Sequence, residues 1–186
     1  MKEIILNSIF RFFLLSISLV SFSFADETLE AIPCSGVPGQ FHVNPDSTMG
    51  GFVASTAFVD SSVIIGYQAT VCERARVTEG AKIQDYAQIS GFSKISGAVL
   101  VSGMAKVLGN ATLENYTGNF MQVAGNAKIY GRAFLKGSVI VADNSEIFGW
   151  AKILDNAQIY GVSKVCGMAV IKNFDLIYDS NDFCEE

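Results

Sequence analysis

The sequence predicts an all-β fold in which one chain coils around itself as a stack of short strands. An apolar residue recurs every six residues from position 59 to position 183, with one interruption. A small residue, usually alanine, precedes it by two positions in most hexads, and a glycine commonly follows it by two. A strand repeats every two residues and a helix every 3.6, so a period of six indicates a short strand followed by a bend.

The apolar position of each hexad is expected to fill the interior of the coil. Before the interruption these core positions are Val59, Ile65, Val71, Val77, Ile83, Ile89, Ile95, Val101, Val107 and Leu113. After it they are Val123, Ile129, Leu135, Val141, Ile147, Ile153, Ile159, Val165, Ile171, Ile177 and Phe183. Twenty of these twenty-one residues are aliphatic, which indicates a continuous core.

The residues that flank each core position predict a strand and then a corner. The local A-x-I alternation is typical of a strand of about three residues. Glycine follows the core residue at positions such as Gly91 and Gly131, and Asp85, Asp143 and Asp155 take its place in other hexads. These residue types tolerate positive φ, which a sharp corner requires. A chain that bends after every short strand coils, and its coils pair strand on strand at about 4.8 Å.

This pattern resembles the hexapeptide-repeat family, whose fold is a single-stranded left-handed parallel β-helix with three hexads per coil. The resemblance covers residues 59–183 and implies a three-sided prism of about seven coils. The family usually places glycine directly after the core residue, whereas here glycine falls one position later. In this respect the chain looks like the A-x-V-x-G-x-A repeats of some bacterial hexapeptide proteins of unassigned activity.

Three segments are expected along the chain. Residues 1–25 have Lys2 and Arg11 before an apolar run and the small residues Ser23 and Ala25 at its end, which is typical of a cleaved signal peptide. A retained anchor is the alternative, but the run spans only residues 12–22, short of the roughly 20 residues that cross a bilayer. Residues 26–56 lack the period and are expected to form an N-terminal cap, with Phe41, Val43 and Phe52 over the first coil. The β-helix then spans residues 57–186, with a four-residue insertion loop within 114–120.

Composition limits the partners of the protein. The net charge is −5 and becomes −6 once Lys2, Glu3 and Arg11 are removed with the signal peptide. An acidic chain is a poor ligand for nucleic acid, which needs a positive face. The signal peptide predicts an exported protein, in the periplasm or the extracellular space, and no later segment is long and apolar enough to span a membrane.

The four cysteines predict two disulfides, because cystines persist in exported proteins. With coils of three hexads, Cys166 and Cys184 lie one coil apart on the same face, where their Cα atoms are within the range that a disulfide accepts. Cys72 lies on that face at the other end, and Cys34 precedes the repeats. We therefore expect the pairs Cys34–Cys72 and Cys166–Cys184.

One of the three predicted faces is poor in charge. Its outward positions hold Lys82 as their only charged residue, and its apolar and aromatic members include Ile64, Leu100, Ile140, Tyr160, Leu176 and Tyr178. Such a face is a candidate for association, and the resemblance implies a homo-oligomer, since relatives of this fold commonly form trimers. The alternative is an ordinary surface, because apolar residues are common on protein surfaces.

Two aromatic residues are candidate ligand contacts. Tyr116 lies in the insertion loop, and loops on rigid scaffolds often bind ligands. Trp150 falls on a corner between Arg132 and Met168, where its ring could stack on a sugar. A glycan or another envelope component is therefore a candidate partner beside a second copy of the chain.

No catalytic, cofactor or metal site is predicted. The best-known hexapeptide-repeat enzymes are acyltransferases with a histidine base between subunits and carbonic anhydrases with a three-histidine zinc site. This chain has one histidine, His42, outside the repeats, and no C-x-x-C pair. The sequence thus favours an exported structural or binding solenoid, and an acyltransferase or its inactive descendant is the alternative.

Overall fold

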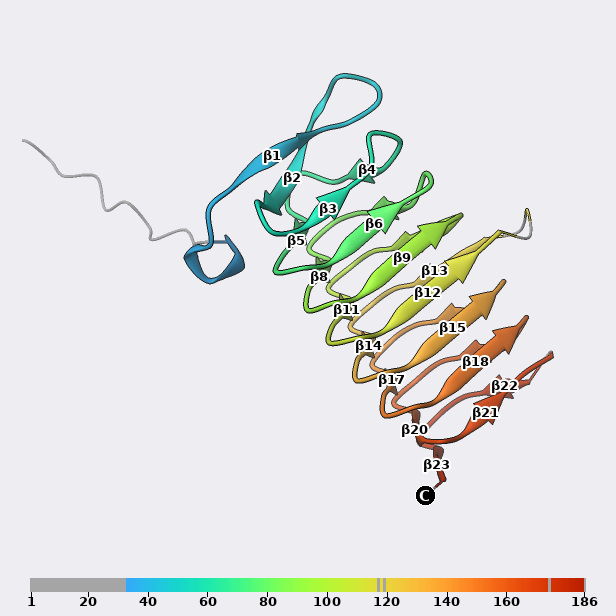
Figure 1. Ribbon diagram of the computed structural model, residues 1–186. Helices are drawn as coiled ribbons and strands as arrows, with labels where there is room; N and C mark the ends of the chain where they lie inside the picture. Colours follow the sequence, from blue (N-terminus) through green and yellow to red (C-terminus); the bar gives the residue numbers. More distant parts are fainter. Residues whose placement is uncertain (1–32, 117, 119, 174, 186) are drawn as a thin grey trace, which may run out of the picture. The chain divides into compact units, whose positions relative to one another are not determined.

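The computed structural model describes residues 33–116, 118, 120–173 and 175–185 of the chain. The predicted signal peptide and the first residues of the predicted cap lie outside this part. Within it, the chain forms a short 3-10 helix, η1 (Pro33–Gly36), and strands in three sheets (Figure 1). These strands stack as a parallel β-solenoid of about seven coils, which confirms the predicted fold class.

Each sheet takes one strand from every coil. Sheet A contains, in spatial order, β1 (Gly39–Val43), β2 (Met49–Ala54), β5 (Thr70–Val71), β8 (Gln88–Ile89), β11 (Lys106–Val107), β14 (Lys128–Ile129), β17 (Glu146–Ile147), β20 (Lys164–Gly167) and β23 (Asp182–Glu185). Sheet B contains β3 (Phe58–Val59), β6 (Arg76–Thr78), β9 (Lys94–Gly97), β12 (Thr112–Asn115), β15 (Phe134–Gly137), β18 (Lys152–Asp155) and β21 (Val170–Ile171). Sheet C contains β4 (Ile64–Ile65), β7 (Lys82–Ile83), β10 (Val99–Val101), β13 (Met121–Val123), β16 (Ile140–Val141), β19 (Gln158–Ile159) and β22 (Leu176–Ile177).

The pairing register shows that one coil takes three hexads. In sheet C, Ile83 pairs with Val101, which lies three hexads further along the chain. In sheet A, Cys166 pairs with Cys184 at the same separation. Three parallel sheets joined in this order fit a three-faced left-handed β-helix, as the sequence predicts.

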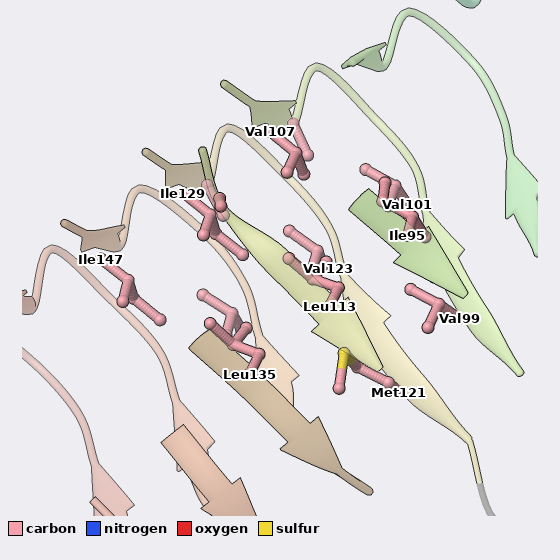
Figure 2. Packing of buried hydrophobic residues seen from close by; sticks show 14 of the residues in the cluster. Ile95, Val99, Val101, Val107, Leu113, Met121, Val123, Ile129, Leu135 and Ile147 are labelled. Atoms are coloured by element: carbon pink, nitrogen blue, oxygen red, sulfur yellow. The ribbon is translucent and has the colours of Figure 1, made fainter. Parts of the chain in front are cut away.

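The core residues of successive coils lie directly on one another inside the solenoid (Figure 2). Most are completely buried, including Ile83, Leu113 and Ile129. Two ends of the series differ. Val59 in the first coil is only half-buried, and Phe183 in the last coil is 42% exposed, so its prediction as a core residue is wrong. β23 is an edge strand of sheet A, and no following strand covers Phe183.

The small residues before each core position line the inner corners. Alanine at these positions is buried in nearly every coil. Where serine replaces it, the hydroxyl donates to a backbone carbonyl three residues earlier, from Ser93 to Ser90 at 2.8 Å and from Ser145 to Ala142 at 2.7 Å. The buried hydroxyl is therefore satisfied, which is why serine is tolerated there.

The corners have the backbone that the sequence predicts. Gly91 has φ +76°, and a Cβ there would lie 2.6 Å from the backbone nitrogen of Gly109 in the next coil, so glycine is required. Asp143 also has positive φ, and its carboxylate accepts a bond of 3.0 Å from the Gly161 backbone N–H one coil later. This bond offsets the strain of the left-handed backbone at Asp143.

The insertion enters where β12 ends, at one corner of the solenoid. Leu113 pairs backward with Ile95 and forward with Leu135, and the forward step is four residues longer. The pairing of β10 with β13 resumes at Met121, so both coils keep their register. Asn115, the last residue of β12, is buried at this corner. Its side chain is 1% exposed, and its Nδ2 donates a hydrogen bond to the Ala98 carbonyl at 3.2 Å.

Replacing Asn115 with alanine should lower the free energy of unfolding by about 1 kcal/mol, the net value of a buried hydrogen bond. Asn110 is the matched control, because it is an exposed corner asparagine on the same coil. Asn110→Ala should stay within about 0.5 kcal/mol of the wild type. Chemical denaturation followed by far-UV circular dichroism measures both variants, and equal losses would show that Asn115 has no special role.

The N-terminal hairpin caps two of the three sheets, but not with the side chains that were predicted. β1 and β2 pair antiparallel, and β2 joins sheet A beside β5. The Asn44 side chain bonds both the N–H (2.8 Å) and the carbonyl (3.2 Å) of Ile65, and so pairs the open edge of β4 in sheet C. The prediction that Phe41 and Val43 cover the first coil is wrong: they are 46% and 68% exposed, because β1 lies outside β2.

Candidate functional site

The candidate site residues lie on the outer surface, because the core occupies the whole interior of the solenoid. On each sheet the residues before and after the core residue point outward and form columns that run along the stack. The columns differ in charge and in size from one sheet to the next. Each sheet therefore presents a different chemical surface.

Sheet C presents the predicted association face. Its first column is continuous in register and holds Ile64, Lys82, Leu100, Gln122, Ile140, Gln158 and Leu176. Apolar and polar residues alternate strictly along it. The second column has small residues in its middle, Ser102, Ala124 and Ala142, and then Tyr160 and Tyr178.

The predicted interface residues are all accessible. Leu176 is 57% and Tyr178 is 55% exposed, and the other four, Ile64, Leu100, Ile140 and Tyr160, are half-buried by their neighbours on the sheet. Lys82 is the only charged residue in the two columns. The face is therefore flat, of low charge and partly apolar.

Sheet A carries an ion pair within one of its outward columns. The Lys128 ammonium lies 3.0 Å from a carboxylate oxygen of Glu146 on the next coil. The hydrogen bond from Lys128 holds the pKa of Glu146 below its usual value. Partial burial of the carboxyl group has the opposite effect on this pKa, but the effect is smaller. Tyr130 and Phe148 stack beside the pair with ring centroids 4.9 Å apart. The middle of sheet A thus carries charged and aromatic side chains that contact one another.

Sheet B carries a groove beside the insertion loop. The groove has a volume of about 410 Å³ and is lined by side chains of β3, β6, β9 and β12 and by Tyr116. The Tyr116 hydroxyl lies 2.8 Å from the Ser96 hydroxyl on the preceding coil, so this tyrosine bends back over sheet B. Its side chain is 60% exposed. Tyr116 therefore forms one wall of a concave surface.

Trp150 has a different environment from Tyr116. It is 57% exposed on the corner after sheet A, and the Arg132 guanidinium lies 4.4 Å from the centre of its ring. One face of the indole is therefore occupied by a cation–π contact. Trp150 lines neither the sheet B groove nor the open pocket at the first coil. Of the two candidate contacts, Tyr116 lines the sheet B groove.

The structure contains both predicted disulfides. Cys34 bonds Cys72 with Cα atoms 5.2 Å apart, and Cys166 bonds Cys184 with Cα atoms 4.4 Å apart. The first ties η1 to the residue that follows β5, and the second joins the last two strands of sheet A. All four cysteines are used.

His42 has a structural contact in the cap. Its Nε2 lies 3.0 Å from the Val63 carbonyl, which only accepts, so Nε2 carries the hydrogen and donates. His42 also borders an open pocket of about 520 Å³ at the first coil, together with Val53, Ala57 and Val59. Among the described residues, no group of three or more His, Cys, Asp or Glu side chains lies close enough to hold a metal ion.

Sequence reasoning missed most of the groove on sheet B. Asp60, Arg76, Thr78 and Ser96 line it, and none of them was singled out as a site residue. One signal was present in the sequence: the short side chains Thr78 and Ser96 follow one another in one column, next to longer ones. The fold-back of the loop onto Ser96 has no such signal.

These features define a class: the protein is a parallel β-solenoid of the three-faced, left-handed β-helix type, with a disulfide at each end. No helix in the described residues has the length and apolar character needed to cross a membrane. No family model, curated protein or solved structure gives a significant match to the chain.

Proposed function

We propose that the protein is an exported β-solenoid that acts through its rigid faces and associates with a second copy of itself through sheet C. The proposal assigns no reaction to the protein. Within it, the six-residue spacing and the three-sheet coil support the relationship to hexapeptide-repeat proteins, and the N-terminal segment is a signal peptide. The two disulfides support export, because such bonds persist in oxidising compartments.

The first column of sheet C is the observation that carries the proposal. Its apolar residues recur on every second coil, about 9.6 Å apart, with a polar residue between them. In the neighbouring column the short side chains of Ser102, Ala124 and Ala142 project little from the middle of sheet C, so that another flat sheet can approach it closely. When two such surfaces pack together, their apolar side chains are removed from water.

The column is also complementary to itself. Gln122 is its central member, and a two-fold axis through Gln122 would place Leu100 of one copy over Ile140 of the other. The same rotation places Ile64 over Leu176 and Lys82 over Gln158. Every apolar residue thus meets an apolar residue, and no two lysines meet. A two-fold interface needs this kind of self-complementarity.

The size of the face is sufficient for a specific contact. Seven strands spaced by about 4.8 Å extend over roughly 30 Å, and one side of the coil is roughly 17 Å wide. The contact would cover on the order of 500 Å² on each copy, or about 1,000 Å² in total, the lower limit for a specific interface. The association is therefore expected to be reversible and concentration-dependent.

The double variant Leu100→Lys, Ile140→Lys should lower the mass in solution. Both side chains are half-buried on sheet C, and in the proposed dimer each lysine would face another lysine. The wild type should sediment as an oligomer that dissociates on dilution, and the variant as a monomer at all concentrations. Sedimentation velocity measures the difference.

The matched control is Leu108→Lys, Leu154→Lys, which puts two lysines at half-buried outward leucines of sheets A and B. This control makes the same change of charge and should leave the oligomer intact. A wild type that is monomeric at every concentration would refute self-association. Equal loss in both double variants would place the contact elsewhere or show a general charge effect.

A further inference from the structure

We propose that the groove on sheet B, beside the insertion loop, binds a neutral saccharide. This sheet B groove is formed by Asp60, Arg76, Thr78, Lys94, Ser96, Glu114 and Tyr116. It lies on a different sheet from the proposed association face, so the two proposals stand independently. Its volume of about 410 Å³ falls in the range of small-ligand sites, about 300–1,000 Å³.

The floor of the groove comes from two short side chains. Thr78 and Ser96 lie opposite one another on β6 and β9, and each presents a hydroxyl. Arg76 and Lys94, which are longer, stand next to them in the neighbouring column and are paired in the same register. Tyr116 forms a wall where its hydroxyl meets Ser96. The short residues between longer ones create the depression.

The charged groups around the floor are mixed. Arg76 and Lys94 supply two cations, and Asp60, Glu79 and Glu114 supply three carboxylates. Hydrogen-bond donors and hydrogen-bond acceptors thus surround the floor of the sheet B groove. The slight excess of carboxylates opposes an anionic ligand.

Two of the polar groups are held in place by the protein. Asp60 Oδ1 accepts the Ser62 hydroxyl at 2.6 Å and the Ser62 backbone N–H at 2.9 Å. Both bonds keep the pKa of Asp60 below its usual value, and the bond from the Ser62 hydroxyl has the larger effect. The carboxylate is therefore charged at neutral pH. The Arg76 guanidinium lies 4.4 Å from the centre of the Phe58 ring. Fixed groups lose little conformational entropy when a ligand binds.

This combination fits the chemistry of a sugar. Each sugar hydroxyl both donates and accepts, so it can bond a carboxylate such as Glu114 and a cation such as Lys94 at the same time. The exposed ring of Tyr116 offers an apolar surface to the C–H groups of a pyranose. The open form of the groove suits part of a longer chain, so an oligosaccharide is the expected ligand.

Titration of the full-length, disulfide-bonded protein with cellotriose, maltotriose and chitotriose tests the proposal. We expect at least one of these probes to shift backbone NMR signals of Thr78, Ser96 and Tyr116, with a dissociation constant between about 10 µM and 10 mM. Tyr116→Ala should weaken this binding at least about tenfold, and Glu114→Gln should weaken it too. Tyr86→Ala is the matched control, since Tyr86 is also exposed (57%) and its hydroxyl is also hydrogen-bonded to a side chain, the Gln68 amide, which donates to it.

Four results would overturn the proposal. The first is that none of the three probes binds at about 10 mM. The second is that the shifted signals cluster around Trp150 or on sheet C instead of the sheet B groove. The third is that Tyr86→Ala weakens binding as much as Tyr116→Ala. Binding of glucuronate in place of the neutral probes would also contradict it, because the two cations would then dominate recognition.

Discussion

Replacing Leu113 with alanine should lower the free energy of unfolding by about 2–5 kcal/mol. Leu113 is completely buried in the fourth coil and packs between Ile95 and Leu135 of the adjoining coils (Figure 2). The backbone around it is held by hydrogen bonds on both sides, so the coil cannot collapse into the space that the side chain leaves. The cost is therefore the lost burial of the leucine together with the energy of a cavity.

Leu154→Ala is the control for this substitution. Leu154 follows a core residue of the same sheet B, but it points outward and is only half-buried. Its loss should cost clearly less, about 1 kcal/mol or below. Urea denaturation followed by circular dichroism compares the two variants, and similar losses would mean that the interior is not tightly packed around Leu113.

The position of Leu113 adds a second observable. In a solenoid each coil contacts only its two neighbours, so a weak coil in the middle can separate the stack into two parts. We expect hydrogen exchange in Leu113→Ala to accelerate first in β9, β12 and β15. Uniform acceleration over all coils would show that the stack unfolds as one unit.

The repeat made the interior predictable from the sequence. Ile83, Ile129 and Ile159 have equivalent surroundings, because every coil places its core residue on the one before it. Counting six residues at a time therefore identified the core, the three faces and the pairing of Cys166 with Cys184. The pairing of Leu113 with Leu135, four residues further than one coil, leaves the ladder intact.

The non-repeating parts could not be predicted in the same way. Phe41 and Val43 look like core residues by hydrophobicity, but the hairpin register places β1 outside β2 and exposes them. Asn44, which pairs the open edge of β4, is a single polar residue in a segment without period. At the other end, Phe183 keeps the period but has no following coil to cover it.

The six-residue repeat did not predict the sheet B groove, for a different reason. The repeat predicts which residues share a column, but a concave surface also depends on the lengths of neighbouring side chains and on the path of the loop. Thr78 and Ser96 are short where Arg76 and Lys94 are long, and Tyr116 returns to Ser96 through a hydrogen bond. Only the three-dimensional structure brings these groups together.

Removing each disulfide should destabilise a different end of the solenoid. The loop closed by Cys34–Cys72 has a sequence separation of 38 and that closed by Cys166–Cys184 one of 18. Loop-closure entropy predicts losses of about 4 and about 3 kcal/mol, respectively, if the whole chain unfolds in one step. The double variants Cys34→Ser, Cys72→Ser and Cys166→Ser, Cys184→Ser keep the remaining disulfide in each case.

The smaller loop should nevertheless have the more local effect. β23 pairs only with β20 in its sheet, and its own residue Phe183 is 42% exposed, so little besides Cys166–Cys184 opposes its detachment. The cap is held more strongly, because β2 pairs with β5 and Asn44 bonds Ile65 even when Cys34–Cys72 is absent.

Limited proteolysis under non-reducing conditions separates the two cases. The variant without Cys166–Cys184 should be cut within residues 172–185 while the rest of the chain stays folded, with a smaller loss in global stability than about 3 kcal/mol. The variant without Cys34–Cys72 should show the larger global loss and no early cut in that segment. If the first variant resists proteolysis as well as the wild type, then strand pairing alone holds the last coil, and the disulfide acts only on the unfolded chain.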